Sequence, residues 1–238
     1  MTSDFSSFRN AFRACANASD ATNATRFFKT GPGDYGEGDK FLGIRVPMTR
    51  SFLPVSDALN ESEVLHLVRS EWHEERLLGL LILVRRFTRA RRDEATREHI
   101  VKLYLANMKW VNNWDLVDTS APHILGAWLL GKDHSVLWKL AKSRSLWEQR
   151  IAVLATQAFI RAGEFAETQA LCQHFLTHRH DLMHKACGWM LREMGKAHVP
   201  SLTAFLDANV AKMPRTMLRY AIEKLTPAQR EYYLEARA

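Results

Sequence analysis

The spacing of apolar residues along most of the chain follows the 3.6-residue period of an amphipathic α-helix. Runs that alternate apolar and polar residues, which are typical of strands, are nearly absent. The periodicity predicts helices over residues 5–16, 21–28, 48–58, 61–70, 72–90, 93–108, 113–130, 134–143, 146–162, 164–178, 181–195, 198–211, 214–224 and 227–237. We therefore expect an all-α protein.

The breaks between these helices contain residues that end or start helices. The chain is interrupted at Asn112, Asn113, Gly131, Gly163 and Pro200, while Pro214 and Pro227 lie at helix starts. The apolar faces recur in pairs every ~40 residues, which is typical of HEAT-type helical solenoids. We expect a HEAT-like helical-repeat solenoid, a curved superhelix of antiparallel helix pairs, that forms a single domain over residues 1–238.

One long irregular segment, residues 30–47, contains five of the eleven glycines. Glycine-rich loops can bind phosphate, but no G-K-[ST] motif follows this one and no strand precedes it. Its acidic residues and Tyr35 also argue against a phosphate site. A folded connecting loop is the better interpretation.

Composition narrows the class of protein. The 238 residues include 33 Lys and Arg against 26 Asp and Glu, and the net charge of +7 favours an anionic partner such as nucleic acid. The three cysteines form no C-x-x-C pair, so neither a disulfide framework nor a cysteine zinc site is expected. No apolar run reaches the ~18 residues of a membrane helix, and residues 1–10 lack the apolar core of a signal peptide. We expect a soluble cytoplasmic protein.

Residues 111–118 carry the first candidate site. Asn112 or Asn113 can cap the helix that begins there, and Asp115 falls in its first turn, where a carboxylate suits the exposed amides. Trp114 and Asp118 are four residues apart and so share one face. The apolar stripe of this helix consists of Val117, Ala121, Ile124, Leu125 and Trp128. A purely structural aspartate would more often face water, so a carboxylate held beside an indole at the edge of such a stripe needs an explanation.

A second candidate is Trp189 in the helix expected from residue 182 to 196. The apolar face of that helix consists of Met183, Ala186, Cys187, Met190, Leu191 and Met194. Trp189 projects nearly opposite, on the side of Lys185 and Arg192. An indole between two cations suits nucleic acid, because the cations bind phosphates and the ring stacks on bases. A neighbouring helix that covers Trp189 is the equal alternative.

Other polar clusters are less specific. Long donors lie along one edge of the helix over residues 146–161, at Arg150, Gln157 and Arg161. This strip suits a phosphate backbone, but a solvated edge is the better interpretation of the strip taken alone. His174, His178, His180 and His184 have i, i+4 spacings, yet the pairs lie on either side of a helix break at Arg179 and no H-E-x-x-H motif is present. We expect no metal site.

The candidate segments together resemble a known family. Five segments resemble the AlkD-type DNA alkylation-repair glycosylases. They are residues 114–118, 146–150 and 185–193, with residues 27–39 and 41–47 near the N-terminus. The similarity runs in one order from about residue 5 to the end. One departure is Asp181-Leu182, which stands where some relatives carry aromatic residues.

The resemblance implies HEAT-like repeats that hold duplex DNA, and hydrolysis of the N-glycosidic bond of cationic alkylpurines such as 3-methyladenine and 7-methylguanine. It implies that Asp118 is the catalytic carboxylate and that Trp114 and Trp189 are the indoles that flank the lesion. Arg150 and Arg192, and with them Lys185, match residues that contact the DNA backbone, and Arg161 extends the same strip. No cofactor is implied, and a monomer on DNA is the simple expectation.

The chemistry fits these residue types. An N-alkylated purine is already cationic and leaves without a general acid, so a carboxylate has only to stabilise an oxocarbenium-like sugar and orient water. A non-catalytic HEAT-repeat scaffold that binds DNA or a protein is the competing hypothesis, and a family member that has lost activity is a third.

Overall fold

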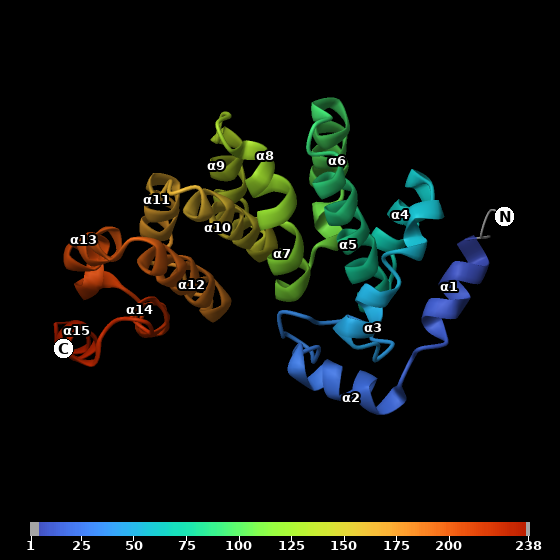
Figure 1. Ribbon diagram of the computed structural model, residues 1–238. Coiled ribbons are helices and arrows are strands. Elements are labelled where there is room, and N and C mark those ends of the chain that lie inside the picture. The colour runs from blue at the N-terminus through green and yellow to red at the C-terminus, as the bar shows by residue number, and fades with distance from the viewer. Residues whose placement is uncertain (1–4, 237–238) are drawn as a thin grey trace. The chain divides into compact units, whose positions relative to one another are not determined.

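The computed structural model describes residues 5–236, which form helices joined mainly by short loops (Figure 1). Within these residues, β pairing is limited to one isolated bridge between Lys40 and Trp72. The all-α prediction is therefore confirmed. Contacts group the chain into two compact units, an N-terminal unit up to Ser120 and a C-terminal unit from Ala121. A single domain over residues 1–238 stays a prediction.

The N-terminal unit contains seven named α-helices within its described residues. They are α1 (Phe5–Arg13), α2 (Ala18–Phe27), α3 (Val46–Ser51), α4 (Glu61–Val68), α5 (His73–Arg89), α6 (Glu94–Ala106) and α7 (Trp114–Ser120), with 3₁₀ turns η1 (Val55–Ala58) and η2 (Met108–Trp110). The helix expected over 48–58 is thus two pieces, because Pro54 disfavours a helical conformation at the residue before it.

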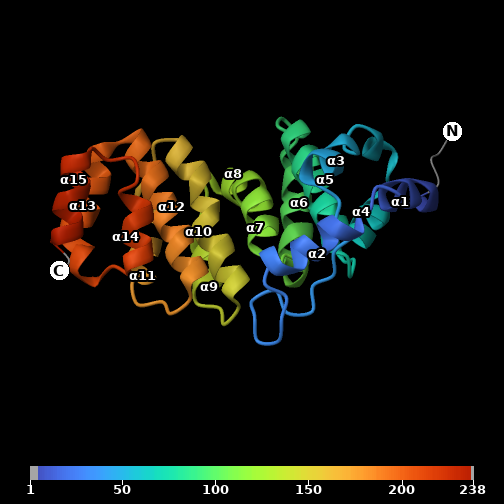
Figure 2. The ribbon, with the colours of Figure 1, turned by 90° about the horizontal axis from the view of Figure 1, so that it is seen from below.

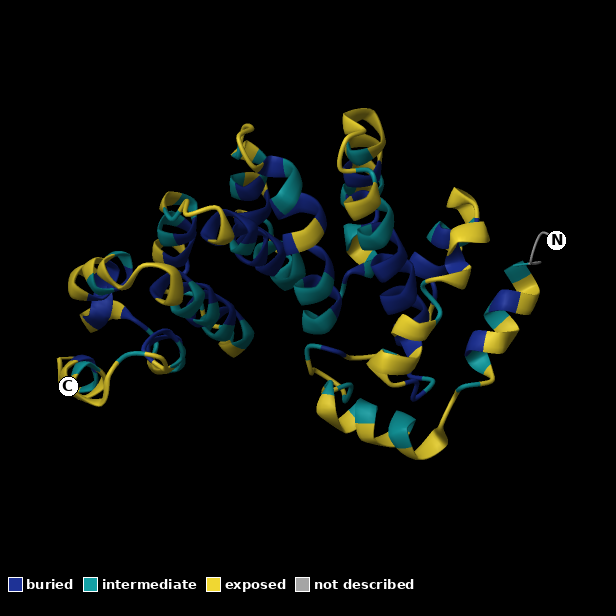
Figure 3. Ribbon diagram, in the orientation of Figure 1, coloured by how far each residue is buried: buried dark blue, intermediate teal, exposed yellow. Residues whose placement is uncertain are grey.

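Helix α5 is the core of the N-terminal unit. Most of its side chains are buried, and it packs against α3, α4, α6 and α7 (Figure 3). Its contact with α4 is so close that a Cβ atom on Gly79 would lie 2.7 Å from the backbone nitrogen of Val68. A glycine is therefore required at this crossing.

The segment between α2 and α3 is a folded connecting loop (Figure 2). The buried carboxylate of Glu74, in the first turn of α5, accepts hydrogen bonds from the backbone N–H groups of Leu42 (2.9 Å), Gly43 (2.8 Å) and Ile44 (3.2 Å). Gly43 has a φ of +77°, and a Cβ atom there would lie 2.1 Å from the carbonyl oxygen of Asn17. The loop amides are thus occupied by the chain's own carboxylate, in agreement with the structural interpretation of the glycines.

The prediction of one continuous helix over residues 113–130 is wrong, because the α-helix is interrupted in the middle of this range. Helix α7 ends at Ser120 and is followed by a π-helical turn, η3 (Pro122–Gly126), and by the short α8 (Ala127–Leu129). Pro122 has no N–H group to continue the α-helical hydrogen bonds. The N–H of Gly126 reaches the carbonyl of Ala121 at 2.9 Å, five residues back, which is the π-helical pattern.

The C-terminal unit continues with helices whose bounds lie close to the expected ones. They are α9 (Ser135–Ala141), α10 (Leu146–Arg161), α11 (Ala166–His174), α12 (Asp181–Ala197), α13 (Val199–Asn209), α14 (Arg215–Ala221) and α15 (Pro227–Glu235), with a 3₁₀ turn η4 (Val210–Lys212). Side-chain caps start several of them. Ser145 accepts from the N–H of Glu148, and Thr226 and Gln229 form a capping box.

Helices α10, α12 and α14 lie side by side and form the core of the C-terminal unit (Figure 2). A Cβ atom on Gly188 would lie 2.5 Å from the carbonyl oxygen of Met217, so α12 and α14 touch backbone to backbone. Cys172 and Cys187 are both buried here as free thiols. No helix in residues 5–236 is long and apolar enough to cross a membrane.

Candidate functional site

Helix α7 brings Trp114 and Asp118 together in the N-terminal unit. Both side chains are half-buried, whereas Leu116, Val117 and Ser120 of the same helix are fully buried. The side-chain oxygen of Asn113 accepts a hydrogen bond from the N–H of Trp114 at 2.8 Å, so an asparagine satisfies the start of the helix as expected. The carboxylate and the indole are therefore one turn apart at the edge of the core.

The indole of Trp114 is held by two phenylalanines at the end of α2. Phe28 stacks on it with a centroid distance of 5.3 Å and an interplanar angle of 23°. Phe27 meets it edge-on at 5.7 Å, although Phe27 itself is 65% exposed. This arrangement fixes the plane of the indole by packing on the protein side.

Asp118 lies close enough to Tyr104 of α6 to affect the pKa of the Tyr104 hydroxyl. Burial raises the pKa of the Tyr104 hydroxyl above its usual range, and the nearby Asp118 charge raises it further. Tyr104 lies 3.1 Å from the hydroxyl of Ser120 and has no exposed surface. The Tyr104 phenol therefore stays neutral beside the Asp118 side chain.

Sequence reasoning missed a buried ionic cluster beside α7. The imidazole of His73 lies between two carboxylates, with Nδ1 2.8 Å from Asp39 and Nε2 2.8 Å from Asp115. Arg76 donates to the other oxygen of Asp39 at 2.6 Å. Exposed side-chain fractions are 2% for His73, 3% for both Asp39 and Arg76, and 13% for Asp115. Buried charges of this kind persist only when paired.

The cluster changes the protonation of His73. Burial by itself lowers the pKa of an imidazole, but the charges and hydrogen bonds of Asp115 and Asp39 outweigh it and raise the pKa of His73 to about 9. The same imidazolium, together with Arg76, keeps the pKa of Asp39 low in spite of its burial. His73 is therefore an imidazolium at neutral pH, held between the side chains of Asp39 and Asp115.

In the C-terminal unit, α12 carries Trp189 with its two cations. Trp189 is half-buried, and its Nε1–H donates to Glu193 at 3.1 Å. Arg192 forms ion pairs with Glu193, at 3.4 Å, and with Glu223. Lys185 pairs with Asp181 at 2.8 Å, one turn earlier. Trp189 is thus neither fully covered nor fully exposed, and both cations are already paired with carboxylates.

The expected strip on α10 differs in burial from one end to the other. Arg150 is only 4% exposed and donates to the carbonyl of Leu182 at 2.7 Å, which joins α10 to the start of α12. Gln157 is half-buried and Arg161 is exposed at the end of the helix. Arg161 is thus the most accessible cation of the strip.

Two histidines near α11 and α12, His178 and His180, accept hydrogen bonds from backbone N–H groups. His178 contacts Gln149 at 3.0 Å and accepts from the N–H of His180, whose own Nδ1 accepts from the N–H of Leu182. Burial and the neighbouring histidines lower the pKa of His178. In residues 5–236, no group of three or more His, Cys, Asp or Glu side chains is placed to hold a metal ion.

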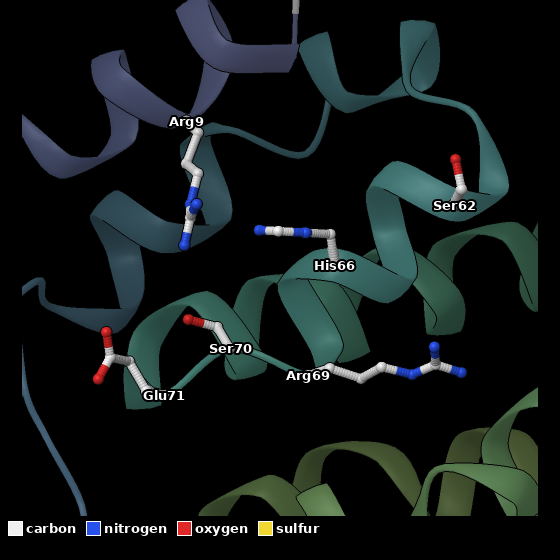
Figure 4. A pocket seen from close by; sticks show the side chains of 6 residues that line it. All are labelled: Arg9, Ser62, His66, Arg69, Ser70 and Glu71. Atoms are coloured by element: carbon white, nitrogen blue, oxygen red, sulfur yellow. The ribbon is translucent and has the colours of Figure 1, made fainter.

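Two surface hollows lie away from the expected residues. One, of about 470 Å³, is lined by residues of α9 to α11 and the histidine segment. The other, of about 410 Å³, is lined by Arg9, Ser62, His66, Arg69, Ser70 and Glu71 (Figure 4). Its Arg9 and Ser70 bind Glu75, and its Arg69 binds Asn107, so much of its polar lining is already engaged. Neither hollow is lined by an expected catalytic residue.

The fold and the pairing of an acid with an indole define an all-α helical-repeat protein with a candidate catalytic helix. The sequence profile of the DNA alkylation repair enzyme family matches residues 8–225, so the chain belongs to that family. A solved structure of a predicted DNA alkylation repair enzyme from Enterococcus faecalis is similar, with a TM-score of 0.68 and 15% identity. The match covers 89% of this chain and 97% of that one. No curated protein matches the chain.

These comparisons confirm the expected family and the all-α helical-repeat fold class. Membership places the chain among enzymes of DNA repair, for which DNA is the substrate.

Proposed function

We propose that this protein is a DNA glycosylase that hydrolyses the N-glycosidic bond of cationic alkylated purines, 3-methyladenine and 7-methylguanine, in duplex DNA. The observation that carries the proposal is the placement of Asp118 and Trp114 one turn apart on α7, both half-buried, in a chain of the DNA alkylation repair enzyme family. The activity needs an ionised carboxylate at an accessible edge of the core and an aromatic face beside it.

The proposed reaction uses the charge already on the substrate. The bond between C1′ and the cationic base breaks heterolytically, and the base leaves as a neutral methylpurine. The deoxyribose develops oxocarbenium character, which the Asp118 carboxylate stabilises. A water molecule then adds to C1′ and loses its proton to Asp118, from which the proton passes to solvent. No cofactor takes part in this scheme.

The indoles have a separate role in the proposal. The face of an aromatic ring attracts a cation through its quadrupole, which is worth roughly 0.5–2 kcal/mol. Trp114, which stacks on Phe28 and lies one turn from Asp118, is proposed to present such a face. Trp189 is proposed as a second indole of the same kind. Both rings favour a charged methylpurine over an ordinary base.

Cationic side chains supply affinity for the phosphates of double-stranded DNA in the proposal. Arg161 is exposed, whereas Lys185 and Arg192 exchange their carboxylate partners for phosphate. Arg150 is the least accessible of the four, and its bond to Leu182 orients it from the protein side. We propose that the protein binds DNA as a monomer.

One observation favours a second candidate function. The ion pairs of Lys185 and Arg192 reduce the positive potential that duplex DNA would meet on α12. A helical-repeat scaffold that binds DNA or a protein without catalysis needs no free cations there and no chemistry at Asp118. Release of free methylpurine from methylated duplex by purified protein distinguishes the two.

The decisive variant is Asp118→Asn. We expect the single-turnover rate of 7-methylguanine release to fall by at least ~100-fold, because a preorganised charge that stabilises a transition state contributes about that much. Affinity for the duplex is expected to stay within about threefold, since no phosphate contact is removed. Base release is measured by chromatography and affinity by fluorescence anisotropy.

A matched control removes an acid elsewhere in the same unit. Glu98 on α6 forms an exposed i, i+4 ion pair with Lys102, and Glu98→Gln is expected to leave both rate and affinity unchanged. If Asp118→Asn instead lost DNA binding in parallel with rate, Asp118 would have a structural role and the scaffold hypothesis would gain.

A further inference from the structure

Beyond the two residues on α7, the N-terminal unit contains a buried charge cluster that the reaction scheme does not use. We propose that His73, as a doubly protonated imidazolium, is a positioning residue that fixes Asp115 and thereby the turn of α7 that carries Trp114 and Asp118. This inference rests on the proposed function. It adds His73, which does not touch the reacting atoms, to the residues on which the rate depends.

The first step is the geometry of the imidazole. Both of its nitrogens lie 2.8 Å from a carboxylate oxygen, Nδ1 from Asp39 and Nε2 from Asp115. A carboxylate can only accept, so each nitrogen must carry a proton. A neutral imidazole has a single N–H, and it would leave one carboxylate facing a lone pair. Only the imidazolium form of His73 can therefore donate a hydrogen bond to both carboxylates.

The second step is that the two carboxylates depend on His73 to different degrees. Asp39 also accepts from Arg76 at 2.6 Å and from the amide of Asn113 at 3.5 Å. The second oxygen of Asp115, Oδ1, is buried and has no hydrogen-bond partner among the described residues. Loss of the bond to Asp39 is thus compensated, whereas loss of the bond to Asp115 leaves a buried charge poorly satisfied.

The third step connects Asp115 to the rest of α7. Asp115 directly follows Trp114, and its carbonyl accepts from the hydroxyl of Thr119 at 2.7 Å, next to Asp118. The whole helix spans only Trp114 to Ser120, so its first turn is a large part of it. A shift of the Asp115 carboxylate therefore moves both candidate catalytic side chains.

A layer of stacked rings makes the same connection. Phe41 stacks on His73 at 4.6 Å, Phe28 stacks on Phe41 at 5.0 Å, and Trp114 stacks on Phe28 at 5.3 Å. Phe28 also contacts His73 directly at 4.8 Å. The imidazolium thus supports the indole through packed aromatic faces as well as through Asp115.

The charged groups that face His73 come from each element packed against it. Asp39 faces it from the loop before α3, and Asp115 faces it from α7. Arg76 of α5 faces Asp39 on the far side. The contributions of Phe28 and Phe41 are uncharged. Deprotonation of His73 would therefore leave two carboxylates against one arginine.

Two substitutions separate the two bonds. The amide nitrogen of glutamine can reach the place of Nε2, so His73→Gln keeps the bond to Asp115. That of asparagine reaches the place of Nδ1, so His73→Asn keeps only the bond to Asp39. At neutral pH we expect the single-turnover rate to fall at least ~10-fold in His73→Asn and less than ~3-fold in His73→Gln, as befits loss of a bond to a buried charge. DNA affinity should stay within about twofold in both, because neither variant removes a phosphate contact.

His99→Asn is the matched control, since His99 pairs with Glu61 on the surface of α6 and should leave the rate unchanged. The pH profile gives a readout that a purely structural role would not move. The wild-type rate should fall by less than ~3-fold as pH rises through about 9, because a neutral His73 can keep its Nε2–H for Asp115, and this small limb should be absent from His73→Gln. Equal rate losses in the two variants, or the same limb in His73→Gln, would overturn the proposal.

Hydrogen exchange distinguishes failure of this inference from failure of the proposed function. In His73→Asn, the amides of α7 should exchange at least ~10-fold faster relative to those of α12, whereas His73→Gln and His99→Asn should resemble wild type. If the wild type released no methylpurine, the glycosylase proposal would fail, yet this exchange pattern would still support positioning by His73. Unchanged exchange of α7 in His73→Asn would overturn it.

Discussion

Two tryptophans of the C-terminal unit have closely similar surroundings and different expected roles. Trp189 of α12 donates its Nε1–H to Glu193 at 3.1 Å, and Trp138 of α9 donates its own to Glu167 at 3.2 Å. Both are half-buried. Truncation of either ring should cost a similar amount of packing, so the pair separates a functional indole from a structural one.

We expect Trp189→Ala to lower the single-turnover rate on 7-methylguanine ~10-fold, which corresponds to loss of a cation–π contact of roughly 1–1.5 kcal/mol. Trp138→Ala should leave the rate unchanged. In urea titrations, both variants should lower the free energy of unfolding by similar amounts. Trp189→Phe keeps an aromatic face and should retain most of the rate. A rate for Trp189→Ala equal to that of Trp138→Ala would show that Trp189 is a packing residue.

The sequence indicated some of these side chains and missed others for a physical reason. Trp114 and Asp118 could be paired because a helix places residues i and i+4 on one face. His73 could not be found, because its two carboxylates are 34 residues before it and 42 residues after it. Its protonation is therefore a property of tertiary contacts alone.

At the scale of elements, the turn after α7 depends on one close contact. A Cβ atom on Gly126 would lie 2.1 Å from the carbonyl oxygen of Ala155 on α10 and 3.1 Å from the Cβ of Ala158. The backbone of Gly126 is nevertheless helical, with φ −59° and ψ −48°. The glycine is thus required by the approach of η3 to α10, and its conformation alone would accept alanine.

Gly126→Ala should therefore destabilise the protein by about 2–3 kcal/mol, as overpacking of a tight contact does. Gly131→Ala is the matched comparison, because Gly131 has φ +69° with no atom near its missing Cβ. That variant should cost only about 1 kcal/mol through backbone strain. The measurement is the midpoint of urea unfolding. Equal midpoints for Gly126→Ala and Gly131→Ala would mean that α10 moves away at Ala155 to make room for the added methyl group.

Helix existence was predictable throughout, whereas the break inside 113–130 was not. Its apolar stripe continues through Ala121, Ile124 and Leu125, all of which are buried as expected. Periodicity does not report how the backbone accommodates Pro122, since a π-helical turn keeps the same side chains inward. Proline marked the position, and packing against α10 determined the geometry.

At the scale of the whole molecule, pH dependence of stability follows from two buried ionic groups. Hydrogen bonds from Arg9, Arg13 and Ser70 overcome burial and lower the pKa of Glu75 to about 2. Its stabilisation is present above the ordinary pKa of 4.5 and is lost as pH falls through about 2. That of His73 is present below 6.5 and is lost as pH rises through about 9.

The free energy of unfolding should therefore be highest between pH 4.5 and 6.5 and decline on both sides. Each limb is worth on the order of 3 kcal/mol, because the pKa of each group in the folded protein lies well away from its ordinary value. In urea titrations across pH, Glu75→Gln should flatten the acid limb and His73→Gln the alkaline limb. An acid limb of full size in Glu75→Gln would assign it to other carboxylates.

The family, too, could be predicted at this scale, because its motifs are spread along the chain. Residues 114–118 belong to the N-terminal unit, whereas 146–150 and 185–193 belong to the C-terminal unit, and the family profile spans both. Which cations are accessible could not be predicted, since Arg150 and Arg161 have the same residue type on one helix and opposite burial.

The bond of Glu74 to three successive amides has a consequence for the energetics of substrate recognition. Residues 42–44 are ordered by a carboxylate from within the chain, so the conformational entropy of this glycine-bearing segment is lost during folding and not during association. Phe41 directly precedes the segment and supports the ring layer under Trp114. The residues that support the indole are therefore ordered before DNA binds, and under the proposed function their ordering does not reduce the free energy of binding to the lesion.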